Sequence, residues 1–263
     1  ISSLQNPTIK RLLQLQEKSR ARRKESRFVV EGGREIEMAL KGGYSLEDIY
    51  YCPELFSIQE LKNLFPGTPD EAFTEVSREV YEKIAYRGST EGVMAVGTAR
   101  DLSMEHFHLQ KANPLILVAE APEKPGNIGA LLRTADAANL DAVLIANPKT
   151  DLFNPNIIRS SIGCVFTNKV ATGTTSEIIA FLQKNNIAIY AAALQASVPY
   201  HSIDFNSPSA IVVGTEATGL SEEWLQNTSR NIIIPMQGEI DSMNVSVAAG
   251  IIIFEAKRQR DFQ

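Results

Sequence analysis

Five short, almost uninterrupted apolar runs divide the C-terminal part of this 263-residue chain. Continuous runs, unlike alternating apolar and polar residues, indicate strands that are buried on both faces, as in a parallel sheet covered by helices. Helical segments separate the runs, and this alternation predicts an α/β domain. We expect strands at 115–119, 142–146, 188–193, 210–213 and 232–234, and helices at 128–139, 156–164, 176–184, 221–226 and 244–260.

The N-terminal part of the chain has the same alternation on a smaller scale. We expect a polar helix at 6–24, strands at 28–31, 49–52, 73–76 and 93–98, and helices at 34–41, 58–64 and 78–85. A polar stretch with His106 and His108 follows, and without further ligands around them these histidines do not predict a metal site. We therefore predict a smaller α/β domain over residues 1–105, a linker over 106–113, and a larger α/β domain over 114–263.

Charge is distributed unevenly along the chain. The formal net charge is −5, yet residues 10–34 contain nine basic and three acidic side chains. Such a stripe is typical of a phosphate-binding surface, and equally of a solvated helix face. The candidates for contact with a nucleic acid are Arg20, Arg22, Arg23, Lys24 and Arg27.

The remaining composition indicates a protein of the cytoplasm. Two cysteines, Cys52 and Cys164, do not form a disulfide framework. No apolar run reaches 18 residues and the N-terminal sequence lacks a signal-peptide pattern, so we expect no membrane partner. We expect no bound metal either, because no cluster of His, Cys and carboxylate residues has the spacing of a metal site.

A first polar loop, 121–127, follows the strand expected at 115–119. It ends at Asn127, and Arg133 lies six residues further along an otherwise apolar helix. Asn is a common helix N-cap, and an exposed Arg often forms a surface salt bridge. Arg also binds phosphate with planar, bidentate geometry, so a ligand site is the alternative interpretation.

Two further polar loops follow later strands. Gly214 and Glu216 lie in the loop 214–219, and Ser242 and Asn244 lie just before the helix expected at 244–260. Glycine lets a ligand approach the backbone closely, whereas Ser and Asn either cap the helix or bind a ligand. Because all three loops follow strands of one parallel sheet, we expect their polar residues to meet at one rim, where such sheets bind ligands.

Several kinds of catalytic machinery are absent from the sequence. It contains no nucleophile elbow, no HExxH and no zinc-ligand pairs, and the glycine spacing of GTEATG fits neither a dinucleotide fingerprint nor a P-loop. His201 is the only histidine after residue 113. The pattern therefore favours a site that binds and orients its ligands over one that performs hydrolase-like proton chemistry.

Taken together, the three loops resemble the motifs of the SpoU, or TrmH-like, RNA 2′-O-methyltransferases of the SPOUT superfamily. The motifs read PGNIGALLRTADA, VVGTEATGLSEE and IPMQGEIDSMNVSVAAG, in the family's order. The third motif usually has Leu where this chain has Met243, a change that conserves volume. Residues 1–105 resemble, more weakly, the small α/β RNA-binding domain that precedes the catalytic domain in rRNA-type members.

The resemblance implies a parallel sheet whose C-terminal part is threaded into a deep trefoil knot, although knots are otherwise almost absent from proteins. It also implies S-adenosylmethionine as cofactor and a homodimer with the active site at the subunit interface. Carried over by motif, the catalytic positions are Arg133, Asn127, Glu216, Ser242 and Asn244, and the cofactor-binding positions are Leu194, Gly214, Ile234, Met236 and Met243.

The expected reaction is attack of a ribose 2′-hydroxyl on the sulfonium methyl group, with rRNA favoured over tRNA as substrate. Because a guanidinium stays protonated, we expect Arg133 to bind the substrate phosphate and polarise the hydroxyl rather than act as a base. Two alternatives stay open: a non-catalytic RNA-binding or ribosome-assembly factor with the same fold, and a nucleotide-binding enzyme such as a dehydrogenase. The missing GxGxxG fingerprint argues against the dehydrogenase.

Overall fold

The computed structural model describes residues 1–88, 90–215 and 218–263. The chain forms two compact units. Unit 1 consists of Ile1–Arg100 and Thr150–Thr167, and unit 2 consists of Asp101–Lys149 and Asn168–Gln263. None of the described helices has both the length and the apolar character needed to cross a bilayer.

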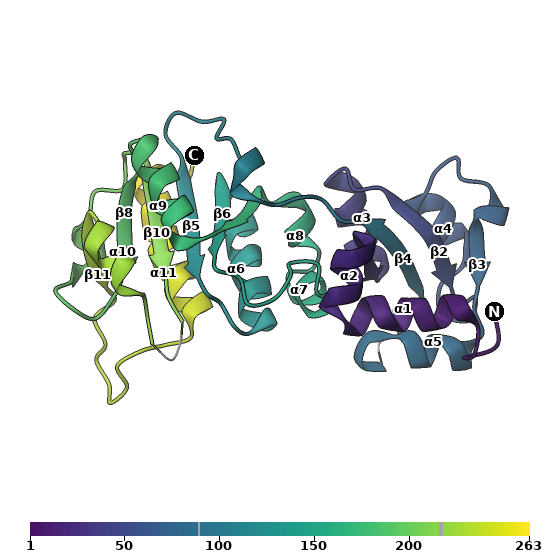
Figure 1. The fold of residues 1–263 in the computed structure, drawn as a ribbon. Helices are drawn as coiled ribbons and strands as arrows, with labels where there is room; N and C mark the ends of the chain where they lie inside the picture. Colours follow the sequence, from purple (N-terminus) through teal and green to yellow (C-terminus); the bar gives the residue numbers. More distant parts are fainter. Residues whose placement is uncertain (89, 216–217) are drawn as a thin grey trace. The chain divides into compact units, whose positions relative to one another are not determined.

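Unit 1 contains a four-stranded sheet in the order β1-β4-β2-β3 (Figure 1). Strand β4 is antiparallel to both of its neighbours, and β3 is parallel to β2. The elements are α1 (Pro7–Glu17), α2 (Ser19–Glu25), β1 (Arg27–Glu31), α3 (Gly33–Lys41), β2 (Leu46–Tyr51), α4 (Ile58–Leu64), β3 (Phe73–Glu75), α5 (Arg78–Ile84), β4 (Val93–Thr98), α7 (Pro155–Ser160) and α8 (Cys164–Thr167). Short 3-10 turns lie at Asp70–Ala72 and Tyr86–Gly88.

The helix expected at 6–24 is two helices. α1 ends at Glu17, Lys18 is extended, and α2 begins at Ser19. Arg22 explains the break, because its Nη1 donates to the carbonyl oxygens of Leu15 and Gln16 at 2.7 and 2.8 Å and so satisfies the last turn of α1. The buried face of α1 nevertheless has the predicted period, with Ile9, Leu12 and Leu15 in the core.

Residues 150–167 belong to unit 1 and not to the C-terminal domain in which the sequence predicted them. Phe153 and Phe166 stack on Phe28 of β1, with ring centroids 4.9 and 5.3 Å apart, and both meet Tyr44 edge to face. A large aromatic surface of unit 1 is thus covered by a segment more than 100 residues later in the chain. Residues 1–105 alone would leave this surface exposed.

Unit 2 is built on a seven-stranded sheet, in the order β7-β6-β5-β10-β8-β11-β9, with every pairing parallel. This confirms the expected α/β class with a parallel sheet; the knotted threading stays a prediction. The elements are β5 (Leu115–Glu120), α6 (Pro125–Ala137), β6 (Ala142–Ala146), β7 (Val170–Gly173), α9 (Thr175–Lys184), β8 (Ala188–Ala192), β9 (Val198–Pro199), β10 (Ser209–Val213), α10 (Glu222–Asn227), β11 (Arg230–Ile233) and α11 (Val245–Gln259), with 3-10 turns at Met104–His106 and Tyr200–Ser202.

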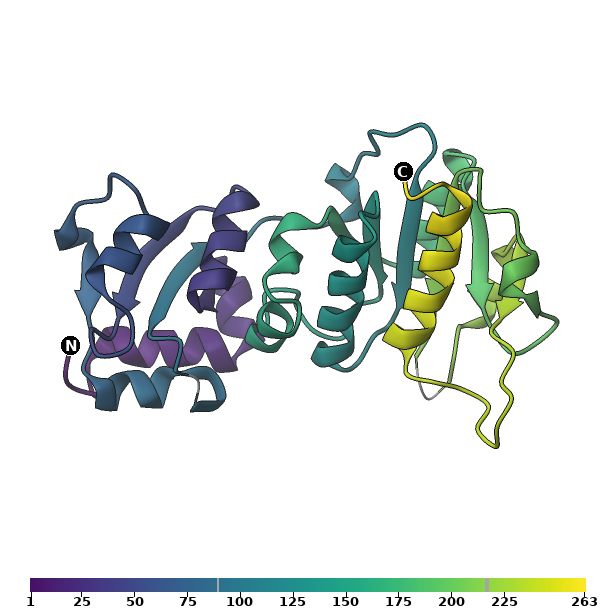
Figure 2. The same cartoon turned by 180° about the vertical axis from the view of Figure 1, so that it is seen from behind.

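Helices cover both faces of this sheet, which is why its strands are apolar throughout. α9 and α10 lie on one face (Figure 1), where Ile178, Leu182 and Trp224 are buried against β5 and β10. α6 and α11 lie side by side on the other face (Figure 2). The site described below lies at the carboxyl ends of the inner strands β5, β8, β10 and β11.

The expected linker, 106–113, is not a free connection at its start. Unit 2 already begins at Asp101, and Phe107 is buried in its core, edge to face with Phe181 at 5.3 Å. The Leu102 carbonyl also accepts a hydrogen bond from the Thr172 amide, which ties the segment to β7. The buried Phe107 packs the start of this polar stretch against unit 2, which its composition did not indicate.

Candidate active site

The carboxyl ends of β8, β10 and β11 surround a cavity of about 420 Å³, here called the apolar cavity. Three chain segments and two helices form its wall. They are Ala192–Gln195 at the end of β8, residues 215 and 218–220 after β10, residues 232–234, 236 and 241–243 of β11 and the loop after it, Ala248 and Ile252 of α11, and Leu225 of α10. Its volume is typical of a small-molecule site.

Four of the five residues expected to bind the cofactor line the apolar cavity. They are Leu194, Ile234, Met236 and Met243. Leu194 is 61 % exposed although it is apolar, which is typical of a side chain at the mouth of a ligand site. The loop that carries it is held in place by Asn231, whose Nδ2 donates to the Gln195 carbonyl at 3.0 Å.

The fifth residue, Gly214, lines two adjoining cavities instead. In its place a larger residue would put its Cβ 2.3 Å from the backbone of Gly219. The two backbones come this close because Thr215 and Gly219 exchange two N–H to carbonyl hydrogen bonds of 3.1 Å each. The glycine is therefore required by the turn itself. Glu216, which the sequence placed in the catalytic group, lies outside the described residues.

Asn127 and Asn244 meet at the rim, as expected. Asn244 Nδ2 donates to Asn127 Oδ1 at 3.2 Å, joining positions 117 residues apart. Asn244 also caps α11, because its Oδ1 accepts from the amide and hydroxyl of Ser246 at 3.0 and 2.6 Å. Asn127 is not a cap: α6 begins at Pro125, so Asn127 lies in the first turn.

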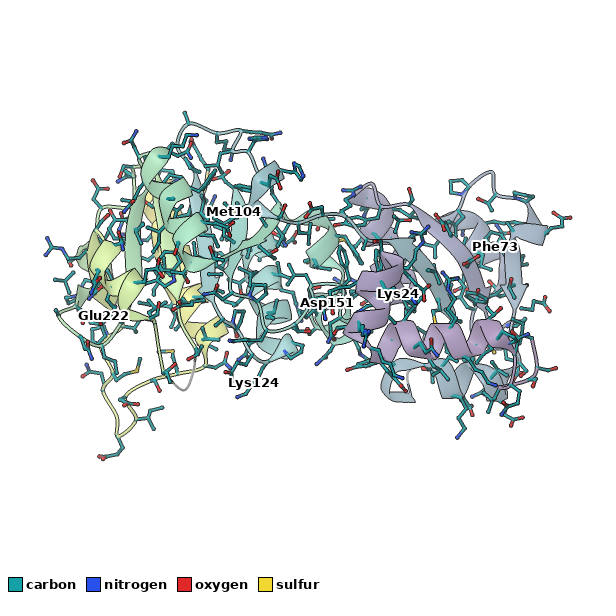
Figure 3. The ribbon with its side chains drawn as sticks, in the orientation of Figure 1. Lys24, Phe73, Met104, Lys124, Asp151 and Glu222 are labelled. Carbon is teal, nitrogen blue, oxygen red and sulfur yellow. The ribbon has the colours of Figure 1, made fainter. Side chains whose placement is uncertain are left out.

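Two cavities flank this asparagine pair. One, of about 600 Å³, is lined by Gly214, Ser242, Met243 and Asn244, and it is called the Asn244 cavity below. The other, of about 240 Å³, is lined by Lys124 (labelled in Figure 3), Asn127 and Gly214. Ser242 and Met243 line both the apolar cavity and the Asn244 cavity, so the two spaces adjoin.

Arg133 is not brought to this rim in the way that Asn127, Ser242 and Asn244 are. It lies on α6, exposed to solvent, six residues or roughly 9 Å along the helix axis from Asn127. It is absent from the linings of the three cavities. The neighbouring Thr134 faces Gly250 of α11, so Arg133 lies beside the surface that α6 and α11 share.

One residue of the rim was missed by the sequence reasoning. Glu120, the last residue of β5, is only 6 % exposed, and its carboxylate accepts hydrogen bonds from Thr175 and Ser221. The available signal was a carboxylate at the end of an otherwise apolar strand. A charge at that place is buried only when it is well paired, which makes it a candidate for a functional role.

The basic stripe is only partly available to a ligand. Arg20, Arg23 and Lys24 are exposed (Lys24 is labelled in Figure 3), and Arg27 is half-buried with its guanidinium 3.4 Å from Glu47. Arg22 corrects the expectation. It is 4 % exposed, and its Nε and Nη2 bind the two oxygens of Asp151 at 2.9 and 2.8 Å, so it is structural.

Within the described ranges, no group of three or more His, Cys, Asp or Glu side chains is arranged to hold a metal ion. The chemistry of the rim described above comes from amides, hydroxyls and a carboxylate, next to an apolar cavity.

Comparisons with known proteins identify the family of this chain. Residues 114–254 match the SpoU rRNA Methylase family, and residues 6–95 match an MRM3-like substrate binding domain. The 23S rRNA (guanosine(2553)-2′-O)-methyltransferase RlmP of Bacillus subtilis (strain 168) is 29 % identical over 98 % of both chains.

Two solved structures are similar over nearly the whole chain. A crystal structure of an RNA 2′-O ribose methyltransferase has a TM-score of 0.86 and 38 % identity, over 99 % of this chain and 98 % of that one. An AdoMet-bound rRNA methyltransferase from Sinorhizobium meliloti has a TM-score of 0.86 and 28 % identity, over 98 % and 97 %. The fold and the rim define a methyltransferase of the SPOUT class. The chain belongs to the SpoU rRNA methylase family.

Proposed function

We propose that this protein transfers a methyl group from S-adenosylmethionine to the 2′-hydroxyl of a ribose in rRNA. The observation that carries the proposal is the hydrogen bond between Asn127 and Asn244, which joins two motifs at the Asn244 cavity, next to the apolar cavity. RlmP, a relative of full length, is named as an rRNA 2′-O-methyltransferase, which supports this substrate. No described feature favours the non-catalytic alternative.

S-adenosylmethionine fits the residues of the apolar cavity. Ile232, Ile234 and Leu225 offer an apolar wall to an adenine ring, whereas Gln195, Asp241 and Ser242 offer polar groups to a ribose and an amino-acid end. Ligand sites commonly combine such a wall with a few polar groups that fix orientation. The cofactor supplies a methyl group on a positively charged sulfur, which is already activated for transfer.

The residues of this chain then have three tasks. Asn127 and Asn244 hold the rim of the Asn244 cavity, where the ribose is received. Arg133 binds the substrate phosphate and polarises the 2′-hydroxyl, and it does so as a cation. A carbon–oxygen bond forms as the carbon–sulfur bond breaks, and the hydroxyl proton leaves to the phosphate or to water. Because DNA lacks the 2′-hydroxyl, the reaction is confined to RNA.

A homodimer with the active site at its interface is part of the proposal. Val247 and Phe254 of α11 are 52 % and 42 % exposed and lie seven residues apart, hence on one face of the helix. Ile240, which lines the Asn244 cavity, is 68 % exposed. A second copy on this surface would cover these apolar side chains and enclose Arg133 of α6.

Replacing Phe254 with glutamate is expected to convert the dimer into monomers, because a carboxylate would be buried at a symmetric contact. Light scattering after size exclusion would measure the mass. Phe262→Glu, at an exposed phenylalanine beyond the end of α11, is the control and should leave the dimer intact. A wild-type protein that is monomeric at micromolar concentration would refute this part of the proposal.

RNA is expected to contact the exposed part of the basic stripe. Changing Arg20, Arg23 and Lys24 to glutamine should weaken RNA binding and lower the slope of log affinity against log salt by about 2, since each phosphate contact contributes roughly 0.7 to 0.9. Fluorescence anisotropy from 50 to 200 mM salt would measure it. The same change at the exposed Lys41, Lys62 and Lys83 is the charge-matched control. Equal slopes in the two variants would exclude the stripe from phosphate binding.

We place this reaction in the cytoplasm. Both cysteines, Cys52 and Cys164, are unpaired and buried, which is compatible with a reducing compartment.

Labelled S-adenosylmethionine tests the reaction itself. The protein is incubated with total RNA from a strain that lacks its gene, and the RNA is then digested with alkali. A methylated 2′-hydroxyl cannot attack the next phosphate, so the label should appear in an alkali-resistant dinucleotide from rRNA. Label released as single nucleotides would indicate base methylation, and absence of label would leave RNA binding without catalysis.

A further inference from the structure

Glu120 is a buried carboxylate of unit 2 to which the proposed reaction assigns no role. Its Oε1 accepts from Thr175 Oγ1 at 3.0 Å and from Ser221 Oγ at 2.7 Å, and its Oε2 accepts from the Ser221 amide at 2.8 Å. A carboxylate that is 6 % exposed requires such donors, because burying it unpaired would be very costly. Ser221 supplies two of the three.

The loop that ends at Ser221 also begins beside Glu120. β10 pairs with β5 so that Val213 lies opposite Ala119, which places Gly214 next to Glu120 in the register. Ser221, seven residues after Gly214, binds the carboxylate of Glu120 through its amide and its hydroxyl. Gly214 and Ser221, which flank the wall residues 215 and 218–220, thus both lie at the end of β5.

The same segment forms one wall of the apolar cavity, through Thr215, Thr218, Gly219 and Leu220. By contrast, the hydrogen bond from Thr175 to Glu120 connects the carboxylate to residues outside the cavity. Thr175 begins α9 and accepts from Asn147 Nδ2 at 2.9 Å, and neither residue lines any of the three cavities. Glu120 is therefore hydrogen-bonded on one side to Ser221, next to the cavity wall, and on the other side to Thr175, at the start of α9.

We propose that Glu120 is a positioning residue that fixes Ser221 and with it the cavity-wall residues 218–220, and thereby sets the affinity for S-adenosylmethionine. The inference rests on the proposed function, because it assigns the apolar cavity to the cofactor. Glutamine at this position keeps the size but has one acceptor oxygen and a donating NH₂ group, which would face either the Ser221 amide or the two hydroxyls. The segment would lose part of its anchor.

Three single variants of the full chain separate positioning from general stability. Glu120→Gln and Ser221→Ala each weaken the contact between Glu120 and Ser221, and Thr175→Val removes only the hydrogen bond between Thr175 and Glu120. Calorimetric titration should show the Kd for S-adenosylmethionine rising roughly tenfold for the first two and changing less than about twofold for Thr175→Val. The double variant Glu120→Gln/Ser221→Ala should bind S-adenosylmethionine no more weakly than the weaker-binding single variant, because both substitutions remove the same interaction. At saturating cofactor, kcat should change less than KM.

Hydrogen–deuterium exchange gives a readout that does not depend on catalysis. Peptides that contain residues 218–221 should exchange faster in Glu120→Gln and Ser221→Ala than in Thr175→Val at matched loss of Tm. An unchanged Kd in both Glu120→Gln and Ser221→Ala would overturn the inference, as would equal effects of all three variants in proportion to their Tm. Wild-type protein that binds the cofactor without methylating RNA would defeat the proposed reaction while the comparison of Glu120 variants still decides this one.

Discussion

Replacing Arg133 with alanine is expected to lower the rate of methyl transfer at least about 100-fold, while S-adenosylmethionine binds as before. The guanidinium is exposed on α6 and does not line the apolar cavity, so its loss leaves the cofactor wall intact. The rate should fall because, in the proposed role, the guanidinium orients the substrate phosphate and the 2′-hydroxyl. Single-turnover rates at saturating RNA and cofactor measure the effect directly.

Two further variants sharpen this test. Arg133→Lys keeps the charge without the planar fork, so an intermediate rate is expected. Arg230→Ala removes an exposed arginine at the start of β11, the end of the strand opposite to the rim, and should leave the rate unchanged. An Arg133→Ala protein within about tenfold of the wild-type rate would rule out the assigned role.

Replacing Arg22 with methionine is expected to lower the free energy of unfolding by about 3 to 5 kcal/mol, although Arg22 belongs to a run of basic residues that is otherwise exposed. The variant leaves the carboxylate of Asp151, whose side chain is 14 % exposed, without its bidentate partner. It also leaves the carbonyl groups of Leu15 and Gln16 without their donor. Urea denaturation followed by circular dichroism would measure the loss.

Arg23→Met, at the exposed neighbour, is the control and should change stability by less than about 0.5 kcal/mol. The pair variant Arg22→Met/Asp151→Leu should recover part of the loss, since it removes both buried charges together. Equal stabilities of Arg22→Met and Arg23→Met would show that the buried pair with Asp151 contributes nothing.

Local patterns were sufficient to predict most elements. Strands β4 and β6 have the predicted bounds, and so does α4, whose start is fixed by a capping box between Ser57 and Glu60. These signals lie within a few residues of the element that they define. β7 and β9 were not predicted, because the first has four residues of mixed polarity and the second only two.

Interactions between distant residues were beyond the reach of those patterns. Arg22 binds Asp151 across 129 positions, and the rings of Phe153 and Phe166 cover Phe28 from a similar distance in sequence. These contacts assign residues 150–167 to unit 1, and the same Arg22 side chain closes the last turn of α1. In the sequence alone, nothing indicates that Arg22 binds Asp151 or that Phe153 and Phe166 pack on Phe28.

The site shows the same division. The rule that parallel strands present their carboxyl ends at one edge was sufficient to expect Asn127, Ser242 and Asn244 together. It could not reveal Glu120, because a glutamate at the end of a strand is ordinarily solvated, and only the fold brings Thr175 and Ser221 to it. Nor could it place Arg133, which is exposed on α6 and lines none of the three cavities.

A crystal structure of the protein with S-adenosylhomocysteine, the unreactive product, tests the central claim most directly. We expect the ligand in the apolar cavity, between Leu194, Ile234 and Met236, with its sulfur directed toward the Asn244 cavity and Asn127. A ligand bound elsewhere on the chain, or one in the apolar cavity with its sulfur directed away from the asparagine pair, would contradict the proposal that these three loops form the site of methyl transfer.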